Sequence, residues 1–377
     1  MHESASGPFA TITTPSMTAI TATFWPPFGA SPWAPPQCPP VAPCPDRADV
    51  AVIGAGVTGL SAALRLLETG RDVVILDRAF GDGAACRSGG IVLGDTLVGA
   101  AAGFDGCEES LRRWVQAHGV RGGLDWQGCI ELDRDCARLP RPLDWRDAGI
   151  VRAAGVVAGG TLDPAGLVEA LAREVHARGA RFVNGANVTS VSTVGTGIVV
   201  RTSAGVVTAT GVVMATDATS RSDVDPWPVR AVTVVVETTP PPAEVLRRAG
   251  WPGRQPFDTN DLPLLWGRRL PSGGLLVGRE LLTDREGDAG GVSRAIHAAG
   301  LRLAARIRGL HPAFADLDVV RVWAGPIART VVGVPALHVD PAHPRVVWAG
   351  GYGGHGLAQA FRLGARAADL VIGAPSA

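Results

Sequence analysis

The 377-residue sequence contains no lysine, so arginine supplies every basic side chain apart from histidine. Any mechanism that needs a lysine amine is therefore excluded. The 35 basic residues are balanced by 35 acidic ones, which gives a formal net charge of zero. Because no arginine-rich run stands out, we expect neither a nucleic-acid groove nor a surface for anionic membranes.

Cysteines and long apolar runs are also scarce. Six cysteines in a chain of this length, none in a C-x-x-C pair, do not form a disulfide scaffold. The apolar runs are far shorter than the ~18 residues of a spanning helix, and no signal-peptide pattern opens the sequence. We expect a cytoplasmic protein with reduced thiols and no membrane partner. Histidine and cysteine show no metal-ligand spacing, so no metal site is expected.

The first 47 residues are predicted to be an irregular segment. Residues 26–45 are crowded with proline, which removes backbone donors and is incompatible with a central strand or a helix interior. Met17 is an alternative start, and we expect deletion of everything before it to leave folding unchanged.

Regular secondary structure is predicted from residue 49 onward. A strand at 49–53, a helix at 60–69 and a strand at 71–76 form a βαβ unit. Strands and helices alternate at both ends of the chain and mix less regularly in the middle. The length allows about two domains. We therefore predict a mixed α/β protein in which a discontinuous, doubly wound domain is interrupted by a second, sheet-based domain.

A G-x-G-x-x-G motif at 54–59 connects the first predicted strand to the first predicted helix. Gly54 permits the tight turn, Gly56 lets a pyrophosphate approach the backbone, and Gly59 lets the helix pack on the sheet. Asp77 lies 18 residues beyond Gly59, close to the ~20 expected for an acid that binds a ribose. This context favours a dinucleotide site over a structural glycine turn.

Later segments follow the order of a known family. They are GAACRSGG at 83–90, GTLDP at 160–164, VVMATDA at 212–218, WAGP at 323–326 and GGYGGHG at 350–356. From about Asp49 to its end, the chain resembles the D-amino-acid oxidase-type (DAO) family of FAD-dependent oxidoreductases. It is most similar to the γ-glutamylputrescine oxidoreductase and sarcosine/glycine oxidase-like members. The final loop implies backbone donors near the negative charge of a reduced flavin.

The resemblance implies a Rossmann-like, glutathione-reductase-type FAD-binding domain (48–96, 158–223 and 321–377) and a mixed β-sheet substrate domain (97–157 and 224–320). Non-covalent FAD is the implied cofactor, because the region around Trp323 lacks the cysteine to which some relatives attach flavin. The implied cofactor contacts are Gly54, Ala55, Gly56, Thr58, Gly59, Asp77, Arg78, Ala85, Arg87, Ser88, Gly89, Val188, Ala215, Gly353, Gly354, His355, Gly356 and Leu357.

The sequence departs from the family pattern at four positions. Ala85 replaces a serine and Ser88 an asparagine in the flavin segment. Leu276 stands at or near the lysine that helps oxygen react in sarcosine-type oxidases, and Ala358 stands where they have a lysine for the substrate carboxylate. Neither cationic role can be filled by lysine here.

Tyr352, His355 and Arg279 are the candidate catalytic residues. Tyr352 is the only tyrosine and lies, like His355, in the glycine-rich final loop. Arg279, Arg268 or Arg269 could bind a substrate carboxylate through two parallel hydrogen bonds.

Three tryptophans, Trp266, Trp323 and Trp348, could form an aromatic wall for a cationic amine, although tryptophan in a strand is more often a core residue. The resemblance implies oxidation of the C–N bond of a small amine or amino acid to an imine, by hydride transfer from the carbon that bears the nitrogen to flavin N5. We expect a monomer or small homo-oligomer. Three alternatives stay open: a dehydrogenase with an acceptor other than oxygen, a tailoring enzyme that desaturates other bonds, and a protein that binds FAD without turnover.

Overall fold

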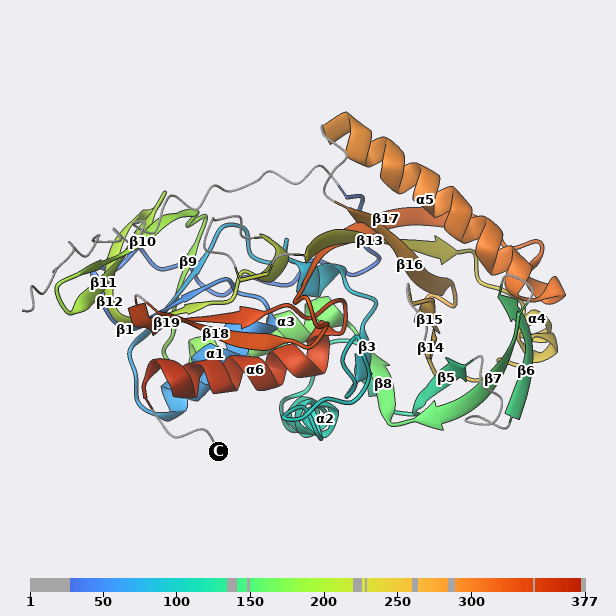
Figure 1. Cartoon of the computed structure of the whole chain (residues 1–377), viewed down its shortest axis with the longest axis horizontal. Helices are drawn as coiled ribbons and strands as arrows, with labels where there is room; N and C mark the ends of the chain where they lie inside the picture. Colours follow the sequence, from blue (N-terminus) through green and yellow to red (C-terminus); the bar gives the residue numbers. More distant parts are fainter. Residues whose placement is uncertain are drawn as a thin grey trace, which may run out of the picture.

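The computed structural model describes residues 28–133, 141–147, 150–219, 226–227, 229–259, 264–283, 289–341 and 343–373. The alternative start at Met17 lies outside these residues. Within them, two eight-stranded sheets stand at opposite ends of an elongated molecule, and a three-stranded sheet lies between them (Figure 1). This mixed α/β architecture confirms the predicted fold class.

Five parallel strands form the core of the first sheet, in the order β9-β2-β1-β12-β19. They are β1 (Arg47–Ile53), β2 (Val73–Asp77), β9 (Arg181–Asn184), β12 (Gly205–Met214) and β19 (His343–Gly350). The chain order reverses between β1 and β12. In an open parallel sheet a ligand binds beyond the carboxyl ends of the strands at such a switch point. The fold therefore places a crevice beside the glycine motif.

Antiparallel strands extend this sheet. The ribbon of β10 (Val188–Val194) and β11 (Gly197–Thr202) pairs with the first half of β12, and β18 (Ala336–Asp340) pairs with β19. The strand β12 continues through Gly211, because residues before and after this glycine pair with β1.

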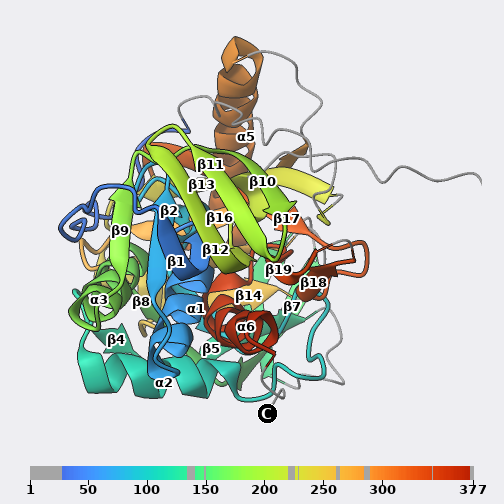
Figure 2. The same cartoon turned by 90° about the vertical axis from the view of Figure 1, so that its left-hand side faces the viewer.

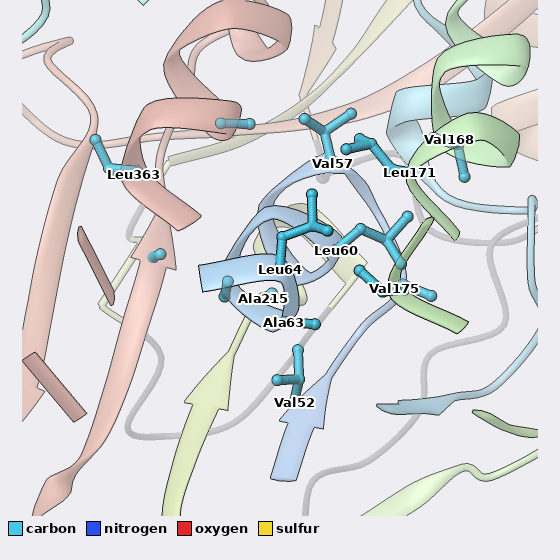
Figure 3. Packing of buried hydrophobic residues seen from close by; sticks show 14 of the residues in the cluster. Val52, Val57, Leu60, Ala63, Leu64, Val168, Leu171, Val175, Ala215 and Leu363 are labelled. Carbon is cyan, nitrogen blue, oxygen red and sulfur yellow. The ribbon is translucent and has the colours of Figure 1, made fainter. Parts of the chain in front are cut away.

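Helices cover one face of the first sheet (Figure 2). They are α1 (Val57–Glu68), α3 (Pro164–Ala177) and α6 (Gly356–Val371). Figure 3 shows Leu60 and Leu64 of α1 packed among apolar side chains of the neighbouring helices and of β1. The crossing of α1 and α6 is close, because a Cβ on Gly364 would collide with the carbonyl oxygen of Thr58.

The second sheet has the order β17-β13-β16-β15-β14-β5-β7-β6. Its strands are β5 (Cys129–Asp133), β6 (Arg141–Asp147), β7 (Ile150–Val157), β13 (Val229–Thr238), β14 (Phe257–Thr259), β15 (Trp266–Arg269), β16 (Leu275–Thr283) and β17 (Val319–Arg329). The helices α4 (Ala243–Arg248) and α5 (Ala289–Leu310) pack on it around Trp145, Trp251 and Phe257. The small sheet consists of β3 (Ile91–Leu93), β8 (Gly159–Leu162) and β4 (Leu124–Asp125).

Two elements near the expected domain boundaries make contacts with the other part of the molecule. The helix α2 (Cys107–His118), expected within the second domain, buries Cys107, Leu111 and Val115 in the same core as α1 and α6. The strand β17, expected from residue 321 onward to belong to the first domain, pairs with β13 in the second sheet. Hydrophobic pattern identifies an element, but which core receives its apolar face depends on contacts between distant parts of the chain.

No helix in the described part of the chain is long and apolar enough to cross a membrane.

Candidate functional site

A cavity lies between the carboxyl ends of β1 and β12 and one face of the second sheet. Four distant segments line it: the glycine motif at 54–58, the segment 83–91, the strand end at 215–218 and the final loop with the start of α6 at 352–360. The second sheet contributes residues from β13, β14, β15, β16 and β17. The cavity thus unites segments that the sequence analysis singled out separately.

The glycine motif has the geometry of an anion cradle. Gly54 has φ +103°, and a Cβ there would lie 2.6 Å from the carbonyl oxygen of Ala215. A Cβ on Gly59 would collide with the carbonyl oxygen of Gly54, whereas one on Gly56 would meet nothing within 4 Å. Gly56 is also the N-cap of α1, where no side chain caps the helix and no acid stands in the first turn. The free N–H groups and the positive helix end therefore point into open space that suits a pyrophosphate.

Asp77 lies beside this cradle at the end of β2. Its carboxylate accepts hydrogen bonds from the backbone N–H groups of Ala55, at 2.6 Å, and Ala79, at 2.8 Å. Burial raises the pKa of Asp77 above its usual value. A carboxylate has about four lone-pair sites, so two remain for ribose hydroxyls.

The segment 83–90 contains a short 3₁₀ turn, Ala84–Arg87, and follows the cavity toward the second sheet. Arg87 donates to the carbonyl oxygen of Gly29 at 2.9 Å and pairs with Asp82 at 3.6 Å, so it connects this turn to the N-terminal segment. The Oγ of Ser88 accepts from the N–H of Gly90 at 3.3 Å. A Cβ on Gly89 would collide with the ring of Trp266. Position 89 therefore needs glycine, because the segment lies against the Trp266 ring of the second sheet there.

The final loop lines the cavity beside the cradle. The hydroxyl of Tyr352 lies 2.8 Å from Oγ1 of Thr58 in the first turn of α1, and burial raises the pKa of Tyr352 well above its usual value. His355 is the N-cap of α6; its Nδ1 lies 3.2 Å from the carbonyl oxygen of Asp95, and burial lowers its pKa. Tyr352 is thus a bonded neutral phenol and His355 favours the neutral ring.

Asp217 lies under the same loop and was missed by the sequence analysis. Its Oδ1 accepts from the N–H of Gly351 at 2.8 Å, and its own φ is +39°, a conformation that Asp adopts more readily than most residues. Burial raises the pKa of Asp217 to about 6. The residue joins the end of β12 to the final loop.

The end of the cavity under the second sheet contains the candidate substrate residues. Arg279, Trp266 and Asp258 line it together with Thr233 and Val235. The Trp266 ring lies against Gly278 and Gly89, since a Cβ at either glycine would collide with it. One aromatic ring, one guanidinium and one carboxylate therefore share a pocket.

The other arginine and tryptophan candidates lie elsewhere. Arg268 is buried and donates to the carbonyl oxygens of Leu162 at 2.7 Å and Gly90 at 3.0 Å, and burial lowers its pKa to about 10. Arg269 donates to the carbonyl oxygen of Gly253 at 3.3 Å. Trp323 and Trp348 are buried in two hydrophobic cores and do not line the cavity. Arg279 and Trp266 are thus the members of these two groups that reach the site.

Most of the implied cofactor residues line the cavity; Gly59, Arg78 and Val188 do not. Gly59 lies inside α1, Arg78 is exposed beside Asp82, and Val188 begins β10 with its side chain buried in a hydrophobic core. A contact of Val188 with the adenine therefore stays a prediction.

Leu276 and Ala358, where relatives have functional lysines, are buried in hydrophobic cores and do not face the cavity. The geometry therefore does not support placing the two lysine roles of the relatives at Leu276 and Ala358.

The site has features that fit FAD. A second uncapped helix end, the start of α6, borders the cavity with no acid in its first turn. Nearby, Gln359 donates its amide to the carbonyl oxygen of Gly94 at 3.3 Å, and its buried Oε1 accepts nothing from the described residues. The described residues contain no group of three or more His, Cys, Asp or Glu side chains suited to a metal ion.

Two uncapped helix ends on one cavity at the switch point of a parallel sheet define a dinucleotide-binding protein of the Rossmann type. The chain belongs to the family of FAD dependent oxidoreductases (DAO), whose model matches residues 49–370, and its cofactor is FAD. The family prediction made from the motifs is thus confirmed.

Known proteins are similar to this chain in sequence or in fold. The probable oxidoreductase OrdL of Rhizobium meliloti (strain 1021) is 26% identical over 395 residues, which cover 89% of this chain and 85% of the relative. The L-proline dehydrogenase of P. horikoshii has a similar fold, with a TM-score of 0.72, 19% identity and coverage of 88% and 96% of the two chains. The glycine oxidase of Geobacillus kaustophilus has a TM-score of 0.68, 20% identity and coverage of 88% and 96%.

Proposed function

We propose that this FAD-dependent oxidoreductase oxidises the C–N bond of a small amine or amino acid to an imine, with FAD held non-covalently. The observation behind the proposal is the pocket under the second sheet, where the guanidinium of Arg279 and the ring of Trp266 line the same cavity as the cradle and the final loop. A guanidinium binds a carboxylate through two parallel hydrogen bonds, and an indole face attracts an ammonium group.

Each part of the cavity has a role in this reaction. Bound FAD supplies the two-electron acceptor. The start of α1 would hold its pyrophosphate, and the start of α6 would place a positive helix end beside the ring system. Arg279 and Trp266 would orient the substrate so that its reacting C–H faces the cofactor. Apolar side chains such as Ile91, Leu97 and Ile327 would exclude water from the reacting atoms.

The named activities of the structural neighbours support a substrate of this class. One neighbour is named an L-proline dehydrogenase and another a glycine oxidase. They also leave the electron acceptor open, since one name denotes a dehydrogenase and the other an oxidase. Sarcosine-type oxidases have a lysine that helps oxygen react, and this chain contains no lysine. This difference favours an acceptor other than oxygen.

The test is anaerobic reduction of the bound flavin by a panel of small amines and amino acids that includes glycine and L-proline. Loss of the visible absorption of oxidised flavin with at least one of them is expected. A yellow, FAD-loaded protein that no member of the panel reduces would contradict the proposal. Peroxide release on admission of air, compared with turnover of an artificial dye, then distinguishes an oxidase from a dehydrogenase.

A further inference from the structure

The carboxylate of Asp258 lies in the wall of the substrate pocket and has no role in the function proposed above. It lies on β14 and lines the cavity. Its Oδ1 is buried and receives no hydrogen bond from any residue that the structure describes. A buried carboxylate oxygen that accepts no hydrogen bond is costly, so such an atom in a cavity wall suggests a missing donor.

The strand register places Asp258 directly opposite Trp266, with Arg279 one strand further along the sheet. Asp258 pairs with Trp266 across β14 and β15, and Trp266 pairs with Gly278 across β15 and β16. Arg279 follows Gly278, where the pairing of β16 with β13 shifts register. Two strand spacings, roughly 10 Å, therefore separate the backbones of Asp258 and Arg279, with the indole between them. This separation suits an anionic and a cationic group on one small molecule.

We propose that Asp258 binds the ammonium group of the substrate through Oδ1 and accepts one of its protons before oxidation. This role rests on the function proposed above. In the step, an N–H bond of the ammonium breaks and an O–H bond forms at Oδ1, and nothing is oxidised or reduced. The resulting neutral amine has the lone pair that stabilises the developing iminium. Arg279 holds the carboxylate of an amino-acid substrate at the other side of Trp266.

The charges around Asp258 suit a proton acceptor. Burial is the main reason that the pKa of Asp258 is raised to about 7, and the carboxylates of Glu131 on β5 and Asp95 beyond β3 raise it further. Arg279 on β16 is the cationic group lining the same end of the cavity. A base with a pKa near the working pH combines a useful ionised fraction with the strongest proton affinity.

The first experiment measures the anaerobic rate of flavin reduction against pH in the FAD-loaded enzyme, with L-proline and glycine as probes. The wild-type rate rises as Asp258 ionises and then levels off. Asp258→Asn is slower by about 10²–10⁴-fold near neutral pH. The difference in rate between the variant and the wild type becomes smaller as the pH approaches the pKa of the ammonium group of the substrate in solution, because an unprotonated substrate needs no base. A loss of equal size at every pH, or no loss, would overturn the proposal.

Two further variants separate proton transfer from a structural effect. Glu131 pairs with Asp258 in register but does not line the cavity. Glu131→Gln removes a neighbouring charge, so the inflection of the rate profile moves to lower pH while the plateau is kept. Asp318→Asn changes a carboxylate whose side chain is 79% exposed on the second domain, and it leaves the profile unchanged. An inflection that stays in place in Glu131→Gln would count against Asp258.

A binding measurement gives an answer independent of turnover. Visible difference spectra of the bound flavin are titrated with pyrrolidine, an ammonium without a carboxylate, and pyrrole-2-carboxylate, a carboxylate without an ammonium. Asp258→Asn weakens pyrrolidine at least about tenfold and leaves pyrrole-2-carboxylate unchanged. Equal pyrrolidine affinity in the two proteins, or no response of the wild type to pyrrolidine, would refute the role of Asp258. If no amine reduces the flavin, the proposed function fails and this titration alone decides the ammonium site.

Discussion

The hydroxyl of Tyr352 and the Oγ1 of Thr58 lie 2.8 Å apart and join two segments separated by 294 positions in the sequence. Both residues are buried, and both line the cavity. The bond joins the final loop to the first turn of α1, so the loop and the cradle lie side by side in the cavity wall. We propose that Tyr352, a catalytic candidate from sequence, is a positioning residue.

Removal of the Tyr352 hydroxyl should therefore lower stability more than it slows chemistry. Tyr352→Phe leaves the Thr58 hydroxyl without its partner, and we expect a loss of about 1–2 kcal/mol in the free energy of unfolding. Urea unfolding measures this value, and Thr58→Val combined with Tyr352→Phe completes a double-mutant cycle. The double variant should cost little more than either single change. A rate of flavin reduction that collapses while FAD content and stability are kept would instead assign the phenol to catalysis.

Two neighbouring glycines should respond differently to the same added methyl group. Gly56→Ala places a Cβ in the open space of the cradle, so the fold should persist while FAD affinity falls by at least about tenfold. Gly59→Ala drives a Cβ into the carbonyl oxygen of Gly54, and about 1–3 kcal/mol of stability should be lost. Flavin titration and urea unfolding of both apoproteins measure the two effects. Equal losses of stability would show that Gly56 is structural.

Arg268 should stabilise the junction between the two sheets without taking part in substrate binding. Arg268→Met keeps much of the apolar stem but leaves the carbonyl oxygens of Leu162 and Gly90 without their donor. We expect a loss of about 2–3 kcal/mol, because hydrogen bonds from a charged donor are the strong ones. Arg269→Met, at the adjacent position of β15, is the matched control and should lower the free energy of unfolding by about 1 kcal/mol or less. Similar losses in the two variants would contradict this assignment.

The local parts of the fold were predictable from the sequence. The βαβ unit around Gly54 and Asp77 was found because a glycine turn, an apolar strand and a helical period follow each other within about 30 residues. Asp163, in the family-like segment 160–164, is the N-cap of α3, and its side chain accepts hydrogen bonds from the N–H groups of Ala165 and Gly166. These signals are short-range, since each depends on residues that are neighbours in the chain.

The parts that failed depend on contacts between distant segments. The sequence patterns of α2 and β17 do not show which part of the fold they join; α2 packs in the core of α1 and α6, and β17 pairs with β13. Asp217, Asp258 and Gln359 were missed because nothing in their sequence surroundings shows that they meet at one cavity. Trp323 and Trp348 were candidates for an aromatic wall around a cationic amine, yet both are buried in hydrophobic cores.

The carboxyl of Asp217 should make the stability of the apoprotein depend on pH in a direction opposite to that of most acids. Burial raises its pKa to about 6, above the value of about 3.9 expected in the unfolded chain. Between these two pH values the folded state binds more protons than the unfolded state. Stability from this group is therefore full below about pH 4, declines as the pH rises, and is lost above about pH 6.

Asp217→Asn should remove this decline and still accept the N–H of Gly351, and asparagine tolerates the positive φ of this position. Urea unfolding of the two apoproteins from pH 4 to pH 8 gives a difference curve in which shared titrations cancel. The variant should match the wild type near pH 4 and exceed its free energy of unfolding by about 1–3 kcal/mol near pH 7. Two parallel curves would mean that Asp217 stays ionised throughout, held by the backbone N–H groups of the final loop.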